Sequence, residues 1–200
     1  MRDVFCRKAK NANYMSLTHA CLLAKLLVVL LIAACASPEP QEAVEGEKMF
    51  RTTDPSRLFF NNVRSSSYYL ERPRGTDLEL YRNRAFSQTA KRPVLVPIIV
   101  NAWLKHEAYL FVRPNDFPGL HDPLTVYWRA DTTVGQLRLE TPTRPEQYRF
   151  ANALYTHVRS DHKLDVLLQD SSRSPIFESR AERAAYLATI RDYYRLTERI

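Results

Sequence analysis

Apolar and polar residues alternate in the middle of the chain, and this alternation predicts β-strands. In residues 124–129 the apolar positions Leu124, Val126 and Trp128 alternate with an opposite face made of Thr125, Tyr127 and Arg129. Residues 136–140 show the same period of two. Because successive side chains of a strand point to opposite faces, each segment predicts a strand with one buried face. The polar residues 131–133 between them predict the turn of an antiparallel hairpin.

Four earlier segments also predict strands. Residues 77–82 alternate, and a Pro-Arg-Gly turn separates them from residues 68–70, so the two segments are expected to pair. Residues 94–104 are apolar and rich in β-branched side chains, and Pro97 within them predicts a strand edge or a bulge. Residues 108–112 follow a charged break and predict the second strand of another hairpin.

The last third of the chain predicts two helices with a short strand, residues 163–168, between them. Thr143 with Glu146, and Ser179 with Glu182, have the spacing of a capping box at a helix start. Apolar residues at spacings of three and four follow each box. This order of elements predicts an α+β domain. We expect a mostly antiparallel sheet of about five to seven strands, with the two C-terminal helices packed on one face.

The N-terminal part of the chain has a different pattern. Residues 26–34 form an unbroken apolar run of nine residues that ends in two alanines and is followed by Cys35. Basic residues outnumber acidic ones before the run. A basic segment, a short apolar core and small residues at a cleavage site are the parts of a cleaved export signal. A membrane-spanning helix needs about 20 apolar residues, so this run predicts a signal peptide rather than a transmembrane anchor.

The segment Ile32-Ala33-Ala34-Cys35 resembles the lipobox of bacterial lipoproteins. In that family the cysteine receives a lipid, so the resemblance implies that Cys35 is lipidated and becomes the N-terminus of a membrane-anchored chain. Stable anchoring takes two acyl chains, and a lipoprotein cysteine carries at least two. The whole layout resembles that of small lipoproteins of the Gram-negative cell envelope. No acidic residue directly follows Cys35, which by the family's sorting rule implies the outer rather than the inner membrane.

These observations predict three parts of the chain. The signal peptide spans residues 1–34, or begins at Met15, which by itself starts a compact signal. Residues 35–55 contain the lipidated cysteine and a proline-rich tether that buries little apolar surface. Residues 56–200 form a single domain. The other two cysteines lie in the removed segment, so the mature chain is expected to have no disulfide and no thiolate metal site.

The charge of the chain points to acidic partners. There are 29 Lys and Arg residues against 22 Asp and Glu, and arginine dominates residues 56–200. The planar fork of arginine suits phosphate and carboxylate, so acidic polymers of the envelope are candidate partners, as is another envelope protein. The predicted compartment argues against nucleic acid. The alternative is a compositional bias that gives an ordinary charged surface. The arginines in local clusters are Arg72, Arg74, Arg82, Arg84, Arg173, Arg180 and Arg183.

A few residues carry candidate chemistry. His157 and Asp161 are four residues apart near a predicted helix end, with His162 beside them, which is the spacing of an acid–base pair or of two metal ligands. A histidine in the last helical turn also interacts well with the helix dipole and then needs no other role. His106-Glu107 begins like a zinc-protease motif, but position 110 is leucine, which excludes that motif. No serine-nucleophile motif or glycine-rich phosphate loop is present.

We therefore expect no catalytic residue, no cofactor and no metal, and one modified residue, Cys35. The favoured hypothesis is a non-enzymatic binding or accessory module that is tethered to the membrane. The alternative is a hydrolase or transferase that acts on cell-wall or lipid substrates through His157, Asp161 or His106. Residues 56–200 resemble no family of known activity.

Overall fold

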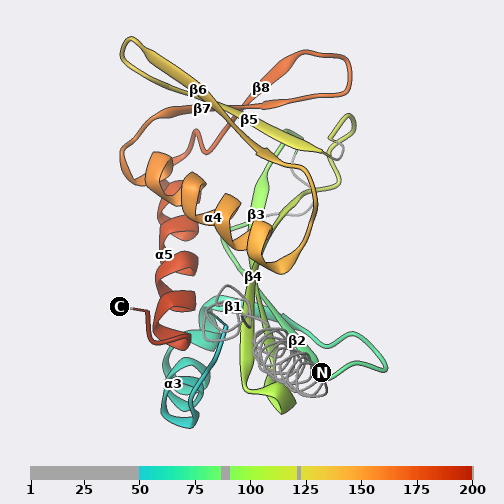
Figure 1. The fold of residues 1–200 in the computed structure, drawn as a ribbon, viewed down its shortest axis with the longest axis vertical. Helices are drawn as coiled ribbons and strands as arrows, with labels where there is room; N and C mark the ends of the chain where they lie inside the picture. Colours follow the sequence, from blue (N-terminus) through green and yellow to red (C-terminus); the bar gives the residue numbers. More distant parts are fainter. Residues whose placement is uncertain (1–49, 87–90, 121–122, 200) are drawn as a thin grey trace, which may run out of the picture. The chain divides into compact units, whose positions relative to one another are not determined.

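The computed structural model describes residues 50–86, 91–120 and 123–199, all within one compact unit, Glu45–Ile200. Within these ranges, eight strands form two four-stranded antiparallel sheets, which we call sheet A and sheet B (Figure 1). The predicted α+β class, with antiparallel strands and two C-terminal helices, is confirmed. The strands are divided between two sheets rather than gathered in one. Cys35 lies outside the described residues.

The first described elements are three short helical segments. They are α3 (Asp54–Phe59), the π-helical η1 (Phe60–Arg64) and the 3-10 helix η2 (Ser65–Ser67). Thr53 caps α3 by accepting a hydrogen bond from the Ser56 backbone N–H. The predicted boundary between tether and domain, at residues 55 and 56, therefore falls inside a helix. This helix was not predicted because it buries no residue and so has no apolar stripe, although Thr53 and Pro55 are helix-start signals in the sequence.

Sheet A has the strand order β1-β2-β3-β4. Both predicted hairpins are present, since β1 pairs with β2 and β3 pairs with β4, and β2 also pairs with β3. All eight residues of β3 are buried, as expected for a central strand that is apolar on both faces. The strands are β1 (Tyr68–Glu71), β2 (Leu78–Asn83), β3 (Leu95–Ala102) and β4 (Glu107–Pro114), and η3 (Trp103–Lys105) joins the last two.

Pro97 corrects one prediction, because it lies in the central strand β3 and not at a sheet edge. It is opposite Val112 of β4, whose N–H points away from β3 and donates to Gln147 Oε1 at 2.9 Å. In an antiparallel pair, two opposite residues that exchange no hydrogen bond both point their N–H groups away from each other. The Pro97 nitrogen of β3 therefore points away from β4 and toward β2. There the pairing ends at Arg82 and Ile98, next to Pro97. The ladder between β2 and β3 therefore ends beside Pro97, whose nitrogen has no hydrogen to donate.

Sheet B has the strand order β6-β5-β7-β8. The predicted hairpin of β5 and β6 is confirmed, with Leu124 opposite Leu139 at its base. The last strand was not predicted, because its four residues include a proline and are too few to show alternation. The strands are β5 (Leu124–Ala130), β6 (Thr133–Leu139), β7 (Lys163–Leu167) and β8 (Arg173–Ile176).

The two long helices begin where the sequence predicts. They are α4 (Arg144–Arg159) and α5 (Arg180–Leu196), and the side chains of Thr143 and Ser179 cap them. The second half of each predicted capping box is absent. The carboxylate of Glu146 accepts from the Thr141 N–H, and that of Glu182 pairs with an arginine.

Helix α4 packs against strands of both sheets. It packs along β4, the edge strand of sheet A, and also against β6 and α5. Its Gln147 occupies the outward N–H of Val112, so this edge position of β4 is already satisfied. The next strand of the chain, β5, belongs to sheet B. The Tyr186 hydroxyl donates to the Ala151 carbonyl at 3.1 Å and joins the two helices in the core.

A buried ionic contact fixes α5 to sheet A. Asp192 of α5 is 1 % exposed and accepts from the Tyr68 hydroxyl at 2.7 Å and from Arg64 Nε at 2.8 Å. Burial, together with the hydrogen bond to Asp192, raises the pKa of the Tyr68 hydroxyl well above its usual range. The hydroxyl therefore stays protonated as a donor, and α5, η1 and β1 are held together through one carboxylate.

Candidate functional site

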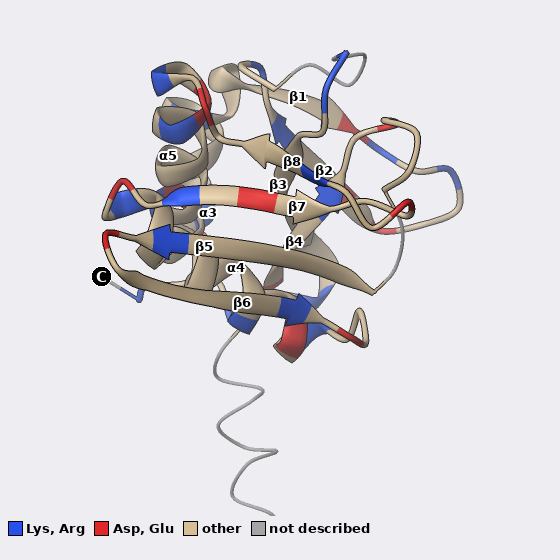
Figure 2. Cartoon of the chain, turned by 90° about the horizontal axis from the view of Figure 1, so that it is seen from above, with Lys and Arg blue, Asp and Glu red and all other residues tan. Residues whose placement is uncertain are grey.

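The outer face of sheet B, which points away from α4, carries polar and charged side chains. Along β5 the buried Leu124 and Val126 alternate with residues that face the other way. Cross-strand partners share a face, so the register brings the outward residues of the four strands together. Figure 2 views the molecule from this side, with the strands of sheet B in front of α4. We call six of these outward residues the basic face: Tyr127, Arg129, Gln136, Lys163, Asp165 and Arg173.

Arg173 and Tyr127 form the centre of the basic face. The guanidinium carbon of Arg173 lies 3.6 Å from the centroid of the Tyr127 ring, which is a close cation–π contact. Asp165 lies opposite Tyr127 on the neighbouring strand. A shallow hollow of about 310 Å³ opens among these side chains and is bordered by Arg129 and Val134.

A second hollow of about 350 Å³ continues the first at the end of the strands. Arg129 lines both hollows, and Lys163 and His162 line the second one. Asp131 and Asp161 also border this second hollow. The two hollows thus share Arg129, and the first also has the apolar Val134 in its lining.

This arrangement offers cations and an aromatic ring to a ligand. Three of the six side chains of the basic face are cations, against one carboxylate, and the aromatic ring offers a flat apolar surface. Arginine binds carboxylate or phosphate through two parallel hydrogen bonds, and an aromatic ring can stack on a planar or sugar-like group. None of the six side chains is a serine, cysteine or histidine, and Asp165 and Lys163 are the two that could act as an acid or a base.

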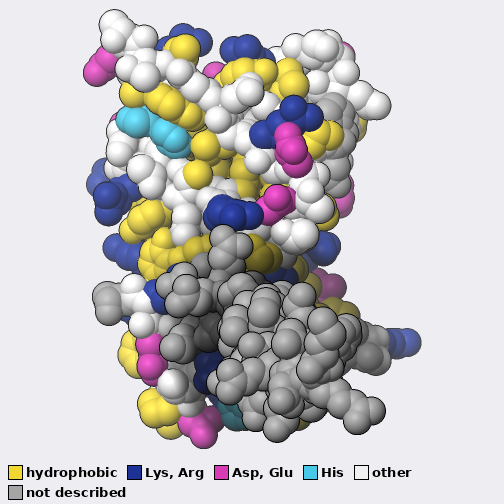
Figure 3. All heavy atoms as spheres, in the orientation of Figure 1, with side chains coloured by type: hydrophobic (Ala, Val, Ile, Leu, Met, Phe, Trp, Pro, Cys, Tyr) yellow, Lys and Arg dark blue, Asp and Glu magenta, His cyan; other side chains and the backbone are white. Residues whose placement is uncertain are grey.

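The histidines predicted as candidates come together on the inner side of sheet B. His157 stacks on the ring of Trp128, with ring centroids 4.4 Å apart, and its Nδ1 lies 2.8 Å from Nδ1 of His162. The two nitrogens share one proton, since one must donate and the other accept. Histidine side chains are visible beside apolar atoms in the upper half of Figure 3. Gly135 leaves room for this stack, because a Cβ there would lie 2.6 Å from the Trp128 ring.

Asp161 does not complete an acid–base pair with His157. Its carboxylate is 86 % exposed and lies 3.2 Å from the Arg183 guanidinium. The described ranges contain no group of three or more His, Cys, Asp or Glu residues that would hold a metal ion. His106 is more than fifty residues from His157 in the sequence and lies on the turn between β3 and β4 in sheet A. There its Nδ1 is 4.0 Å from the Asp54 carboxylate.

The histidine pair makes the stability of the fold dependent on pH. Burial, and then the neighbouring His162, lower the pKa of His157 below 6.5. The unfolded chain therefore binds a proton at a higher pH than the folded chain, so stability falls as pH drops through about 6.5. We expect His157→Gln to reduce the slope of unfolding free energy between neutral and mildly acidic pH, measured by urea denaturation. His162→Gln should reduce it less, and an unchanged slope in His157→Gln would contradict this assignment.

Three of the seven clustered arginines, Arg72, Arg82 and Arg183, are engaged in ion pairs, and the seven do not form a common site. Arg72 pairs with Glu79, and Arg82 pairs with Glu71. The Arg84 guanidinium lies over the ring of Tyr69. Of the arginines singled out from the sequence, only Arg173 belongs to the basic face.

The sequence contains part of the signal for the basic face. Alternation already places Tyr127 and Arg129 on the strand face opposite the core. Lys163 and Asp165 come from a predicted strand whose neighbours were not predicted, and Arg173 comes from β8. The pairing of β7 with both β5 and β8 is therefore the missing information.

Comparisons with known proteins found no match: no family model, no curated protein and no solved structure is similar to this chain. In the part of the chain that the structure describes, no helix is both long enough and apolar enough to cross a bilayer.

Proposed function

We propose that the chain is a lipoprotein of the bacterial cell envelope, anchored through a lipid on Cys35, with its domain acting as a non-enzymatic binding module. The anchor is supported by the sequence of residues 26–35, in which an apolar run ends in two alanines and a cysteine. The outer membrane is the proposed location, because no acidic residue directly follows Cys35.

We propose the basic face as the binding surface, with an acidic polymer of the envelope as its ligand. The stacked pair of Arg173 and Tyr127 is the observation that carries this proposal, because it presents a fixed guanidinium on an exposed sheet. Arg129 and Lys163 add two cations across the adjacent hollows. A polymer with carboxylates or phosphates along a sugar chain would match this spacing of cations around an aromatic ring.

A hydrolase or transferase has less support. The three residues on which that alternative depends have separate surroundings: His157 is paired with His162, Asp161 with Arg183, and His106 lies on a turn of the other sheet. A general base must reach the proton that it removes, and an orienting carboxylate must reach the base.

Charge reversal on the basic face tests the proposed ligand class. We expect Arg129→Glu combined with Arg173→Glu to weaken binding at least about tenfold, since two charge-assisted contacts become repulsive. The measurement is co-sedimentation of the detergent-solubilised protein with purified peptidoglycan, and in a separate arm its binding to lipopolysaccharide. Binding of the unchanged protein should weaken as salt is added.

Arg180→Glu provides a matched control, because Arg180 is exposed at the start of α5 and outside the basic face. It changes the net charge in the same way as each single reversal. Equal losses in the control and in a single basic-face variant would mean that net charge alone drives binding, which contradicts a defined site. Binding to neither polymer would contradict the proposed ligand class.

A further inference from the structure

Large apolar side chains are exposed at one end of the described unit. They lie on α3 and η1 and on the turn η3 between β3 and β4, and their exposed fractions range from 44 to 62 %. Isolated exposed apolar residues need no explanation, but a group of large ones marks a surface that contacts another apolar phase. We call this group the tether-end patch; it consists of Leu58, Phe59, Val63, Trp103 and Leu104.

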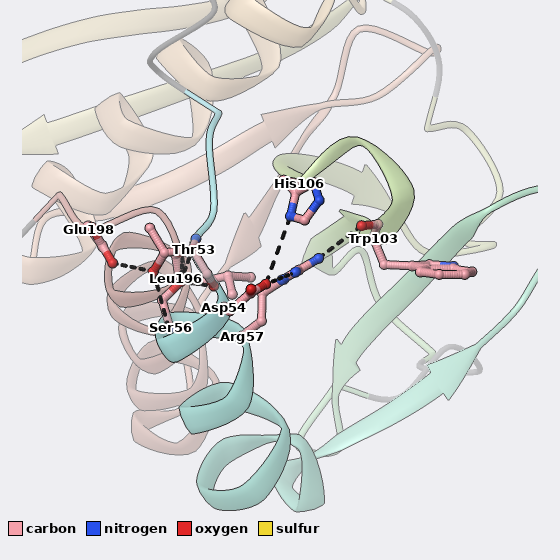
Figure 4. Close-up of polar contacts among 8 residues, drawn as sticks. All are labelled: Thr53, Asp54, Ser56, Arg57, Trp103, His106, Leu196 and Glu198. Carbon is pink, nitrogen blue, oxygen red and sulfur yellow. Dashed lines mark hydrogen bonds and ion pairs between the residues drawn. The ribbon is translucent and has the colours of Figure 1, made fainter.

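Direct contacts join the two parts of the patch. Arg57 of α3 donates to the Trp103 carbonyl at 2.9 Å and also pairs with Asp54 (Figure 4). In the same view, the Trp103 ring points away from α3, and the residue is 48 % exposed. The indole is therefore held at its backbone and remains free to contact something outside the unit, while the helix and the turn keep a fixed relation to one another.

The chain reaches the domain at this same end. The Thr52 N–H donates to the His106 carbonyl at 2.8 Å, and the Ala108 N–H donates to the Phe50 carbonyl at 2.8 Å. The first described residues are thus paired to the residues that follow η3. Cys35 lies only fifteen residues before Phe50. Fully extended, such a segment spans at most about 50 Å, so a lipid on Cys35 would keep this end of the domain close to the bilayer.

The chemistry of the patch fits a membrane surface. Tryptophan is enriched at the level of the lipid headgroups, and leucine and phenylalanine favour the acyl boundary below it. Two exposed cations, Arg51 and Lys105, flank the apolar side chains and suit anionic headgroups. The carboxylate of Asp54, which would be repelled by such headgroups, is paired with Arg57.

We infer that the tether-end patch docks on the bilayer that holds the lipid of Cys35. This inference rests on the proposed lipid anchor, because the anchor makes docking an intramolecular event with a high effective concentration. Trp103 and Leu104 enter the interface, Leu58 and Phe59 lie beside them, and α3 rests on the headgroups. The domain is thereby oriented, with the tether-end patch toward the membrane.

The two tryptophans of the chain provide an internal comparison. Trp103 belongs to the patch, whereas Trp128 stacks on His157 in sheet B. The acylated full chain is reconstituted into vesicles of phosphatidylethanolamine and phosphatidylglycerol that contain lipids brominated in their acyl chains. We expect the Trp128→Phe variant, which keeps Trp103, to lose more than about half of its emission, as an interfacial indole should. The Trp103→Phe variant, which keeps Trp128, should retain its emission.

A second pair of variants avoids any change at Trp128. Leu104→Glu adds a charge to the patch and should reduce the quenching of the unchanged chain at least about twofold, because a carboxylate opposes insertion beside anionic lipid. Val134→Glu is the matched control, since Val134 is also exposed, at 67 %, but lies on β6. It should leave the quenching unchanged.

Flotation of the vesicles separates the docking from the anchor. A chain that floats with the vesicles while Trp103 stays unquenched contradicts docking and leaves the anchor intact. Emission of Trp103 that shifts to the blue only at high protein density, without lipid quenching, would assign the patch to contacts between copies and overturn the inference. A chain that carries no lipid and does not float contradicts the anchor, and the docking with it.

Discussion

Replacing Asp192 with alanine is expected to lower the free energy of unfolding by about 2–4 kcal/mol. The carboxylate is 1 % exposed and joins Tyr68 of β1 and Arg64 of η1 to α5. Its removal leaves the buried Tyr68 hydroxyl without its acceptor, which by itself costs about 1–3 kcal/mol. The loss at Arg64 is smaller than for a fully buried pair, because 29 % of its side chain is exposed and water screens the charge.

Urea denaturation of the purified chain measures this effect. Asp192→Asn should cost less than Asp192→Ala, because the amide oxygen can still accept from Tyr68. Asp116→Ala removes a carboxylate from an exposed position and should stay within about 0.5 kcal/mol of the unchanged chain. A double-mutant cycle with Tyr68→Phe isolates the Tyr68–Asp192 contact. An Asp192→Ala variant as stable as the Asp116→Ala control would contradict the structural role given to the buried carboxylate.

Replacing Cys35 with serine is expected to abolish lipid attachment completely. A thioether needs a sulfur nucleophile, and the serine hydroxyl is a far weaker one at neutral pH. Cells that express the full chain are fed a labelled fatty acid, and the label is then measured on the isolated protein. The variant should also disappear from the outer membrane, since two acyl chains contribute about 0.8 kcal/mol for each methylene buried in the bilayer.

Cys21→Ser is the matched control for this experiment, because Cys21 precedes the apolar run and lies within the predicted signal peptide. It should take up the label like the unchanged chain. Label that persists in Cys35→Ser, or that is lost in Cys21→Ser alone, would show that the lipid is attached elsewhere.

Local patterns in the sequence predicted the local parts of the fold. The hairpin of β5 and β6 was found because its strands alternate and only two residues, Asp131 and Thr132, separate them. The starts of α4 and α5 were found because Thr143 and Ser179 cap them. In each case the residues that determine the structure lie within a few positions of one another.

The division into two sheets could not be predicted in this way. It accompanies contacts between distant residues, such as the hydrogen bond from the Val112 N–H of β4 to Gln147 of α4, 35 residues apart. Helix α3 escaped prediction because it buries no side chain, and β8 because it is too short. Helix α3 does have a local signal, the Thr53 cap, whereas β8 depends on its pairing with β7.

The candidate site could likewise be predicted only in part, because it too depends on contacts between residues far apart in the sequence. The strand pattern placed Tyr127 on the outer face of its strand, and the sequence singled out Arg173 only as one arginine among several. Their contact at 3.6 Å arises because β7 lies between β5 and β8. The sequence predicted a contact for His157 but with the wrong partner. The spacing of His157 and Asp161 suggested that these two meet, whereas the turn after α4 brings His162 to His157 instead.

Mass spectrometry of the protein extracted from native membranes tests the proposed anchor most directly. The account predicts a mature chain whose first residue is Cys35 and whose mass exceeds that of the polypeptide by a diacylglycerol group. A chain that still begins at Met1 or Met15, with an unmodified thiol at position 35, would contradict it.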